Sequence, residues 1–354
     1  MEALLNSVKR VCHSALDSIS LRRRVAELVA PRLAFDSYAF STCDPDTGLM
    51  THVVADGVPP RYAMTYVTAL YPEHCAQIAM DQPRRGVHVF SMLEESPVVR
   101  EAVLANGMRE QVQVSVATTD RLWGTWCLMR ASRRTAKDER SRSLLRQLVP
   151  HLARGLRAAA LIDIGLASTT THGSNAAGVL VLDARDRPVL RTPLAATWLR
   201  DLSDIGLRMP DDLPLAIIGL VTRLRSRRVE VAPALRMRAR GQSGRLYTLR
   251  GSLAEPDAAG ECASVVVIQP AAPREVASLL TLLYDLSARE REVVAAVARG
   301  EATKTIAASL GISPHTVVEH VDRACEKIGV RGRKALIAKL FFAGYAPFLA
   351  DGRG

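Results

Sequence analysis

The 354-residue chain lacks the features that mark most enzymes, membrane proteins and secreted proteins. It contains no G-x-S-x-G segment, no glycine-rich phosphate loop and no His/Glu metal pair at helical spacing, so no enzyme is predicted. No apolar run is long enough to cross a bilayer, and the first residues lack the apolar core of a signal peptide. We therefore expect a cytoplasmic protein without catalytic activity and without a membrane partner.

Cysteine and aromatic residues are also scarce. The six cysteines are scattered, with neither a CxxC pair nor metal-ligand spacing, so we expect reduced thiols and no metal or other cofactor. A redox sensor among them is the alternative. His52, His74 and His88 fit ordinary surface or core positions better than a haem or metal site. Aromatic residues make up only 5% of the chain, but a hydrophobic content of 48% is enough for real cores.

Acidic residues are outnumbered, and the net charge of +11 favours an anionic partner. The excess is not concentrated at one end, because residues 284–354 hold 11 Lys/Arg against 8 Asp/Glu, a net of +3, and leave +8 on the rest. An arginine cluster at residues 223–228 contributes to that remainder. We expect it to be a solvated face, with a nucleic-acid patch as the alternative, so net charge is supporting evidence only.

The most strongly patterned stretch runs from Leu286 to Leu340. Ser287 and Glu290 have the S-x-x-E spacing of a capping box, in which each side chain bonds the other residue's backbone. An apolar stripe of valines follows at helical spacing, and Gly300 is placed to end this helix in a left-handed conformation. The pattern predicts a first short helix with both ends defined.

Three more helices follow in the same stretch. Thr303 is the expected N-cap of a second helix that ends at Gly311. Ser313–Pro314 begins a third helix as N-cap and first helical residue, and a fourth extends from about Arg333 to Phe342. The small side chain of Ala307 before the glycine turn allows two helices to cross closely.

These features resemble the LuxR-type helix-turn-helix over the whole module. The residues that carry the resemblance are Leu286, Ser287, Arg289, Glu290, Glu292, Val293, Gly300, Lys304, Ile306, Ala307, Leu310, Ile312, Ser313, Thr316, Val317, His320, Lys327, Ile328, Gly329 and Val330. The resemblance implies an all-α four-helix domain that places its third helix in the major groove of DNA. The alternative is a helical bundle that docks a protein and not DNA.

The resemblance also implies which side chains contact DNA, across the motif from Thr303 to Asp322 and just beyond it. The predicted DNA-binding set is Thr303, Lys304, His315, Thr316, Val318, Glu319, His320, Asp322, Arg323, Lys327, Arg331 and Arg333, with Lys334 beside it. Basic and hydroxyl members would contact phosphates, Val318 would pack on a thymine methyl and Glu319 would accept from a cytosine amino group. Val318, Glu319 and Asp322 depart from the family pattern, and a head that binds weakly on its own is the alternative consequence.

Residues 1–164 have the pattern of an α+β domain. Strands are predicted at Ser37–Thr42, Leu49–Ala55, Val112–Ala117 and Leu122–Arg130, with helices at Leu4–Ser18, Arg22–Pro31, about Pro60–Tyr71 and Lys137–Ile164. The segments Phe35-Asp36-x-Tyr38 and Leu122-Trp123-Gly124, with the closing helix around Pro150–Arg154, resemble a GAF domain. That resemblance implies small-molecule sensing or dimerisation.

A Ser/Thr/Gly-rich linker is predicted at residues 165–176. Residues 177–270 open with a strand, a charged turn, a second strand and a helix, which resembles a PAS domain. The remaining strands of this domain are predicted at Arg236–Arg240, Arg245–Ser252 and Ser264–Gln269. A second linker at residues 271–283 leads into the LuxR-type domain at 284–344, and residues 345–354 form a tail.

Together the patterns predict a multidomain bacterial transcription regulator: α+β GAF-like and PAS-like sensory domains followed by an all-α LuxR-type domain. We expect sequence-specific binding of double-stranded DNA as a homodimer, with the helix Pro314–Lys327 of each copy in successive major grooves. RNA polymerase is an open option as a further partner. The small-molecule effector, the target sequence and the sign of regulation do not follow from the sequence.

Overall fold

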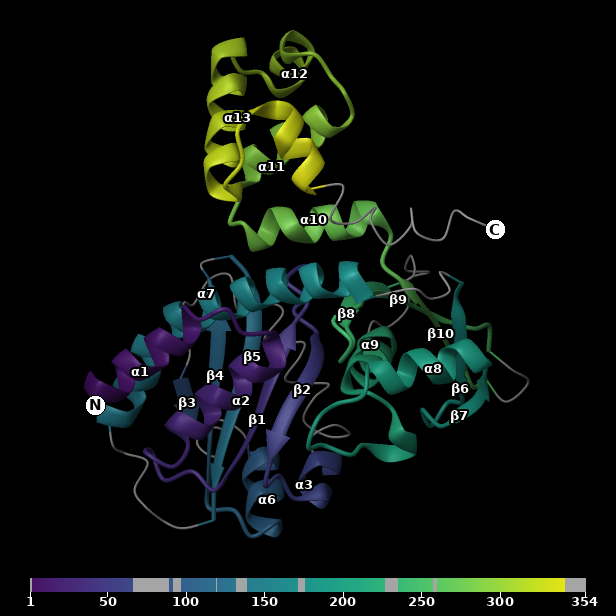
Figure 1. Ribbon diagram of the computed structural model, residues 1–354. Coiled ribbons are helices and arrows are strands. Elements are labelled where there is room, and N and C mark those ends of the chain that lie inside the picture. Colours follow the sequence, from purple (N-terminus) through teal and green to yellow (C-terminus); the bar gives the residue numbers. More distant parts are fainter. Residues whose placement is uncertain are drawn as a thin grey trace. The chain divides into compact units, whose positions relative to one another are not determined.

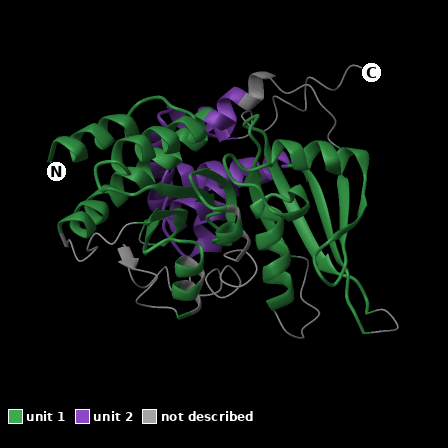
Figure 2. Cartoon of the chain, turned by 90° about the horizontal axis from the view of Figure 1, so that it is seen from below, with its two compact units in different colours: residues 1–162, 175–270 green, residues 163–174, 271–354 purple. Residues whose placement is uncertain are grey.

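The computed structural model describes residues 2–65, 89–91, 97–118, 120–131, 139–170, 176–226, 235–256 and 260–340. The chain divides into two compact units, residues 1–162 with 175–270 (the front unit) and residues 163–174 with 271–354 (Figure 2). The α+β pattern predicted for the two front segments and the all-α pattern of the head are confirmed. No helix within the described ranges is long and apolar enough to span a bilayer.

A five-stranded antiparallel sheet forms the centre of the first segment (Figure 1). Its strands are β1 (Ser37–Cys43), β2 (Met50–Asp56), β3 (Val89–Ser91), β4 (Glu110–Ala117) and β5 (Leu122–Arg130), in the order β2-β1-β5-β4-β3. Every residue of β4 and β5 is buried, so protein covers both faces of the sheet. The strands predicted from alternation and turn residues are confirmed.

Five helices accompany this sheet in the described part of the first segment. They are α1 (Glu2–Cys12), α2 (Ser18–Val29), α3 (Pro60–Thr65), α6 (Pro97–Ala105) and α7 (Glu139–Thr170). The helix predicted over Leu4–Ser18 was too long, because Asp17 caps α2 by accepting hydrogen bonds from the backbone of Ile19 and Ser20. The predicted helix at Pro60–Tyr71 is confirmed as far as Thr65, and its later residues lie outside the described ranges.

The second segment repeats the sheet topology of the first. β6 (Gly178–Leu182), β7 (Pro188–Arg191), β8 (Leu235–Arg240), β9 (Leu246–Leu253) and β10 (Ser264–Pro270) form a sheet of order β7-β6-β10-β9-β8. Numbered from its own first strand, each sheet therefore has the order 2-1-5-4-3. The helices α8 (Pro193–Asp201) and α9 (Leu215–Ser226) supply buried residues to a core with Leu180, Leu249 and Val266.

Both predicted linkers are partly helical, which corrects the sequence-based boundaries. α7 continues through residues 165–170, because the single Gly165 costs only about 1 kcal/mol, the Leu, Ala, Ser and Thr that follow cost less, and the stretch contains no proline. Residues 271–283 contain α10 (Pro273–Leu283), which begins with proline at its first position and a Glu275 side chain that accepts from Ala272 N at 2.9 Å. Its leucines are buried, so this segment belongs to the second unit and is not a free linker.

The histidines and cysteines weighed as ligands have ordinary roles where the structure describes them. His52 is buried, and its Nδ1 accepts from Arg22 Nη2 at 2.9 Å, since a guanidinium can only donate. Burial and the neighbouring Arg22 charge lower the pKa of His52 well below its ordinary value. His74, His88 and Cys75 lie outside the described ranges, and the other cysteines are free thiols.

The arginine cluster predicted as a solvated face is partly structural. Arg225 Nε donates to Asp186 at 2.7 Å, and its Nη atoms donate to the carbonyl oxygens of Asp183 and Cys262. These bonds tie the end of α9 to the β6–β7 turn. The end of the cluster, residues 227 and 228, lies outside the described ranges.

A loop of the second segment extends the first sheet at its free edge. Ala55 N of β2 donates to Ile205 O at 2.7 Å, and Ile205 N donates to Val53 O at 2.9 Å. The Asp204 carboxylate accepts from Val53 N at 2.7 Å and from Leu215 N at 2.8 Å. Burial raises the pKa of Asp204 to about 6. We call residues 204–206 the edge segment, because it joins the two front segments through backbone hydrogen bonds.

Gly206 allows this close approach, and its replacement is expected to destabilise the front unit. Its φ is +72°, and a Cβ there would lie 1.9 Å from Ala55 O. Gly206→Ala should therefore lower the free energy of unfolding by more than about 2 kcal/mol. Gly107→Ala is the matched control, since Gly107 has φ +75° but no atom within 4 Å of the added Cβ. Equal losses in urea unfolding for the two variants would contradict the steric role.

A buried ion pair makes a second connection between the front segments. Arg238 of β8 donates to Asp44 in the β1–β2 turn through Nη2 at 3.0 Å, Nε at 3.3 Å and its backbone N at 3.2 Å. Asp46 contacts both Arg238 and Arg121. Burial raises the pKa of Asp44 above its ordinary value, although the Arg238 charge acts in the opposite direction. The side chain of Asp44 is 2% exposed and that of Arg238 is 8% exposed, so neither charge is solvated.

Candidate nucleic-acid interface

The head is a bundle of short helices in the second unit. They are α11 (Ala288–Ala298), α12 (Thr303–Leu310), α13 (Pro314–Ile328) and a helix at residues 332–340. The capping box is formed, since Ser287 Oγ accepts from Glu290 N at 3.2 Å and Glu290 Oε2 accepts from Ser287 N at 2.7 Å. The predicted helices are confirmed, and the end of the fourth beyond residue 340 lies outside the described ranges.

The turn between α12 and α13 follows the predicted punctuation. Gly311 ends α12 with a left-handed φ of +64°, and Ile312 N donates to Ala307 O at 3.0 Å. Ser313 Oγ then caps α13 by accepting from Thr316 N at 3.0 Å, with Pro314 as the first helical residue. The two helices therefore cross at a fixed geometry that the turn and the caps define.

The N-cap of α12 was predicted one residue too late. Ala302 holds the cap position, and Thr303 is already the first helical residue. Ile306 N donates to Ala302 O at 3.0 Å, which closes the first turn without a side-chain cap. Thr303 is half-buried, and its hydroxyl has no capping role.

Buried apolar side chains hold α13 against the other helices. Val293, Val297, Ile306, Ala307 and Val317 form a shared core. The opposite side of α13 faces solvent, where His315, Val318, Asp322 and Arg323 are exposed and Thr316, Glu319 and His320 are half-buried. Val318 is 46% exposed, which is unusual for a large apolar residue in this chain. The structure therefore brings most of the predicted DNA-binding set onto one helix with its outer face uncovered.

Glu319 lies between two basic side chains, which explains how an acid is tolerated on this face. His315 Nε2 lies 3.4 Å and Arg323 Nη2 lies 3.7 Å from its carboxylate, one helical turn before and after it. Because His315 and Arg323 are exposed and Glu319 is only half-buried, each pair stabilises the helix by at most about 0.5 kcal/mol. The more important consequence is local charge, since Glu319 does not face an anionic backbone alone.

His320 and Asp322 have less favourable surroundings for such contacts. The Nδ1 atom of His320 is shielded from solvent and has no hydrogen-bond partner in the described ranges, so only the rest of the ring is available. Asp322 is exposed and forms no ion pair with a described residue. Both remain on the outer half of α13.

Lys327 and Arg333 are engaged within the bundle. Lys327 Nζ lies 2.7 Å from Glu290 Oε2 and donates to Asp285 O at 3.1 Å. Arg333 donates to Glu301 O in the loop before α12. Burial alone would raise the pKa of Glu290, but hydrogen bonds from Lys327 and Ser287 outweigh it and lower that pKa. Sequence reasoning missed this pair, although the capping position of Glu290 gave a signal for it.

Lys327→Met is expected to destabilise the head by about 1 kcal/mol at neutral pH, because Glu290 keeps its charge and loses a donor. Glu290 has a lowered pKa in the folded chain, so its contribution is present above pH of about 4.5 and is lost on acidification. The stability lost in Lys327→Met should therefore become smaller as the pH falls. Lys334→Met is the control, since Lys334 is exposed and forms no hydrogen bond or ion pair with a described residue. Hydrogen exchange of the α11 amides measures the stability of the head in both variants. Equal protection in Lys327→Met and Lys334→Met would contradict the stabilising role of Lys327.

Lys304, Arg331 and Lys334 are exposed and form no ion pair or hydrogen bond with any residue in the described ranges. With Arg323, whose partner Glu319 is 3.7 Å away, they are the available cations among the side chains predicted to contact DNA. Four such cations on a small helical head suit a polyanion better than a protein groove.

Comparison with known proteins agrees with this geometry. Residues 285–340 match the family described as bacterial regulatory proteins, luxR family. The chain is similar to the probable transcriptional regulatory protein NarL of Mycobacterium tuberculosis, with 50% identity over 54 residues, 15% of this chain and 25% of NarL. It is similar to the transcriptional regulatory protein UhpA of Escherichia coli, with 45% identity over 56 residues, 16% of this chain and 29% of UhpA. The chain thus spans about a quarter of the length of these relatives.

Similar solved structures include the phycoerythrobilin-bound GAF domain of a cyanobacterial phytochrome, with 15% identity, 45% of this chain, 96% of that chain and a TM-score of 0.33. SdiA of Escherichia coli has 14% identity, 93% and 92% coverage and a TM-score of 0.28. These values are low, and family membership depends on the head alone. The spore germination protein GerE of Bacillus subtilis is 41% identical over 59 residues, which are 17% of this chain and 80% of GerE. With GerE matched over most of its length, the chain belongs to the luxR family of bacterial regulatory proteins.

Proposed function

We propose that this protein is a DNA-binding transcription regulator that inserts α13 into the major groove. The observation that carries the proposal is an intact helix-turn-helix whose outer α13 face, from His315 to Arg323, is uncovered. The relatives NarL and UhpA are described as transcriptional regulatory proteins, which supports the same function. No catalytic step is part of the proposal.

The proposed contacts divide by chemistry. Phosphates are contacted by Thr303, Lys304, His315, Thr316, Arg323, Arg331 and Lys334. Val318 packs on a thymine methyl, and Glu319 accepts from a cytosine amino group while its paired bases offset phosphate repulsion. Lys327 and Arg333 act mainly by holding the bundle, and His320 and Asp322 line the outer half of the helix.

We further propose that the chain acts in the cytoplasm as a homodimer on an inverted repeat, with the two α13 helices roughly 34 Å apart. The GAF-like residues 1–164 and the PAS-like residues 177–270 are the sensing and dimerising part. Residues 284–344 are the DNA-binding domain and 345–354 a tail. A signal at the front unit would shift the population of binding-competent dimers, and RNA polymerase remains an open partner.

Selection of bound sequences from a random duplex library tests this proposal. The full-length chain is expected to enrich an inverted repeat with half-sites about one helical turn apart. Val318→Ala should alter the preference at one position of each half-site. Val189→Ala is the matched control, because Val189 is also exposed, at 62%, but lies on β7. A failure to enrich any sequence at low salt would refute the function.

A further inference from the structure

A cavity lies inside the front unit, between the first sheet and the second segment. Its wall includes Met50 of β2, Cys127 and Met129 of β5 and Tyr62 of α3. Leu207 and Leu215, which come from the second segment, complete it. The enclosed part can hold the centre of a water-sized molecule over about 40 Å³, and the whole hollow, including the part open to solvent, measures about 450 Å³. No charged side chain lines it in the described ranges, so an ion would lose its hydration without compensation.

A row of buried polar groups adjoins this cavity. Tyr62 OH donates to Gln111 Oε1 at 2.5 Å, and Gln111 Nε2 donates to Cys127 Sγ at 3.3 Å. The Cys127 thiol in turn donates to Gln113 Oε1 at 2.5 Å. Burial raises the pKa of Cys127 to about 12, so the thiol keeps its proton and remains a donor. Each of these donors therefore has an acceptor within the row.

Gln113 Nε2 is the exception. The residue is fully buried, and this nitrogen has no hydrogen-bond partner in the described ranges. An unsatisfied buried amide destabilises the protein by about 1–3 kcal/mol. Gln113 stands opposite Cys127 in the β4–β5 register, on the strand face that lines the cavity. Gln113 does not itself line the cavity, but its amide contacts Cys127, which does, so the unused donor lies directly behind the wall of the apolar space.

We propose that this cavity binds a small, neutral, mainly apolar molecule with one acceptor oxygen, held jointly by both front segments. The apolar wall selects the body of the ligand, and the Gln113 amide selects its oxygen. Asp204 accepts from Val53 N and Leu215 N, and both of these residues line the cavity. A ligand therefore adds contacts across the joint that the edge segment makes. This inference deepens the sensing part of the proposed function and rests on it for its biological purpose.

Two probes of similar shape test the inference on the full-length chain. Acetophenone has the acceptor oxygen, and ethylbenzene lacks it. With ¹³C-labelled methionine methyl groups, the signals of Met50 and Met129 should shift saturably, while Met237, which is buried in the same core but does not line the cavity, should not. Acetophenone should bind about tenfold more tightly, as expected for one added hydrogen bond.

Variants separate the two parts of the site. Gln113→Leu should remove the preference for acetophenone, and Leu207→Ala should weaken both probes several-fold. Leu190→Ala, on the exposed strand β7, should change neither. Absence of binding, or binding that leaves Met50 and Met129 unshifted, would overturn the site, and equal affinity of the two probes for the unaltered chain would overturn the acceptor requirement. The unaltered chain alone decides whether the cavity binds the probes and whether it prefers the acceptor oxygen. The test therefore holds even if a variant fails to fold.

DNA binding by the same samples distinguishes this inference from the proposed function. DNA binding without probe binding overturns the cavity proposal alone. Probe binding without DNA binding supports the cavity and refutes the regulator.

Discussion

Raising the salt concentration from 50 to 200 mM is expected to weaken DNA binding by the dimer about 10³–10⁵-fold. The head leaves Lys304, Arg323, Arg331 and Lys334 available for phosphates, and a dimer doubles this set. Eight neutralised phosphates correspond to a slope of about −7 in log affinity against log salt. Fluorescence anisotropy with a selected duplex measures the slope, and a flat dependence would favour a protein-docking role for the head.

Arg323→Ala tests the contribution of a single cation to this salt dependence. Two copies of the substitution should reduce the slope by about two and weaken all sequences alike. Lys327→Ala should lower the stability of the head but leave the slope almost unchanged, because Lys327 is paired with Glu290. Arg24→Ala, an exposed position on α2 in the front unit, is the control. If Lys327→Ala changed the salt dependence of DNA binding and Arg323→Ala did not, the assignment of Arg323 to phosphate contact and of Lys327 to bundle stability would be wrong.

Arg238→Met is expected to lower the free energy of unfolding of the front unit by about 3–5 kcal/mol. The substitution leaves the Asp44 carboxylate buried without its main counter-charge. Asp44 already has a raised pKa, and such an acid destabilises the fold as pH rises through that pKa. The deficit should therefore shrink on acidification, when Asp44 becomes neutral. Urea unfolding at two pH values measures both effects.

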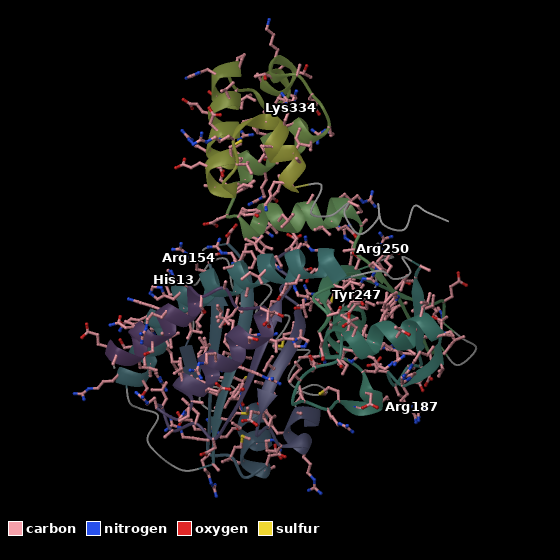
Figure 3. The ribbon with its side chains drawn as sticks, in the orientation of Figure 1. His13, Arg154, Arg187, Tyr247, Arg250 and Lys334 are labelled. Atoms are coloured by element: carbon pink, nitrogen blue, oxygen red, sulfur yellow. The ribbon has the colours of Figure 1, made fainter. Side chains whose placement is uncertain are left out.

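The double variant Asp44→Leu with Arg238→Met separates the pair from its surroundings. Replacing both charges by apolar groups should recover much of the lost stability, because no charge then remains buried. Arg187→Met is the surface control, since Arg187 lies at the surface of the second segment (Figure 3) and its bond to Asp183 is solvent-exposed, so little stability should be lost. If Arg238→Met lost no more stability than Arg187→Met, the buried pair of Asp44 and Arg238 would contribute little to the stability of the front unit.

The sequence predicted those parts of the fold that depend on local patterns. Alternation and turn residues placed β1, β2, β4 and β5 within two residues of their bounds, because a strand with a buried face fixes its own register. Caps and glycines did the same for the head, where Ser287, Gly311 and Ser313 occupy the expected positions. Local chemistry decides where such elements begin and end.

The rest depends on contacts between residues far apart in the chain. α10 was predicted as a linker, because its apolar side chains are explained only by burial against other elements. Asp204 and Val53 are 151 positions apart, and no local pattern announces their bond. Lys327 was assigned to DNA because its charge is visible in the sequence, whereas its pairing with Glu290, 37 positions away, depends on the fold. The cavity was missed for the same reason.

The edge segment affects whether the first segment can be produced as a separate fragment. β2 is the border strand of its sheet, and its backbone N–H and C=O groups are satisfied on that side by residues of the second segment. A fragment that ends near residue 164 would leave this border bare, as a template for strands of other molecules. We therefore expect residues 204–206 to protect the first sheet from aggregation, so that the two front segments should be produced together.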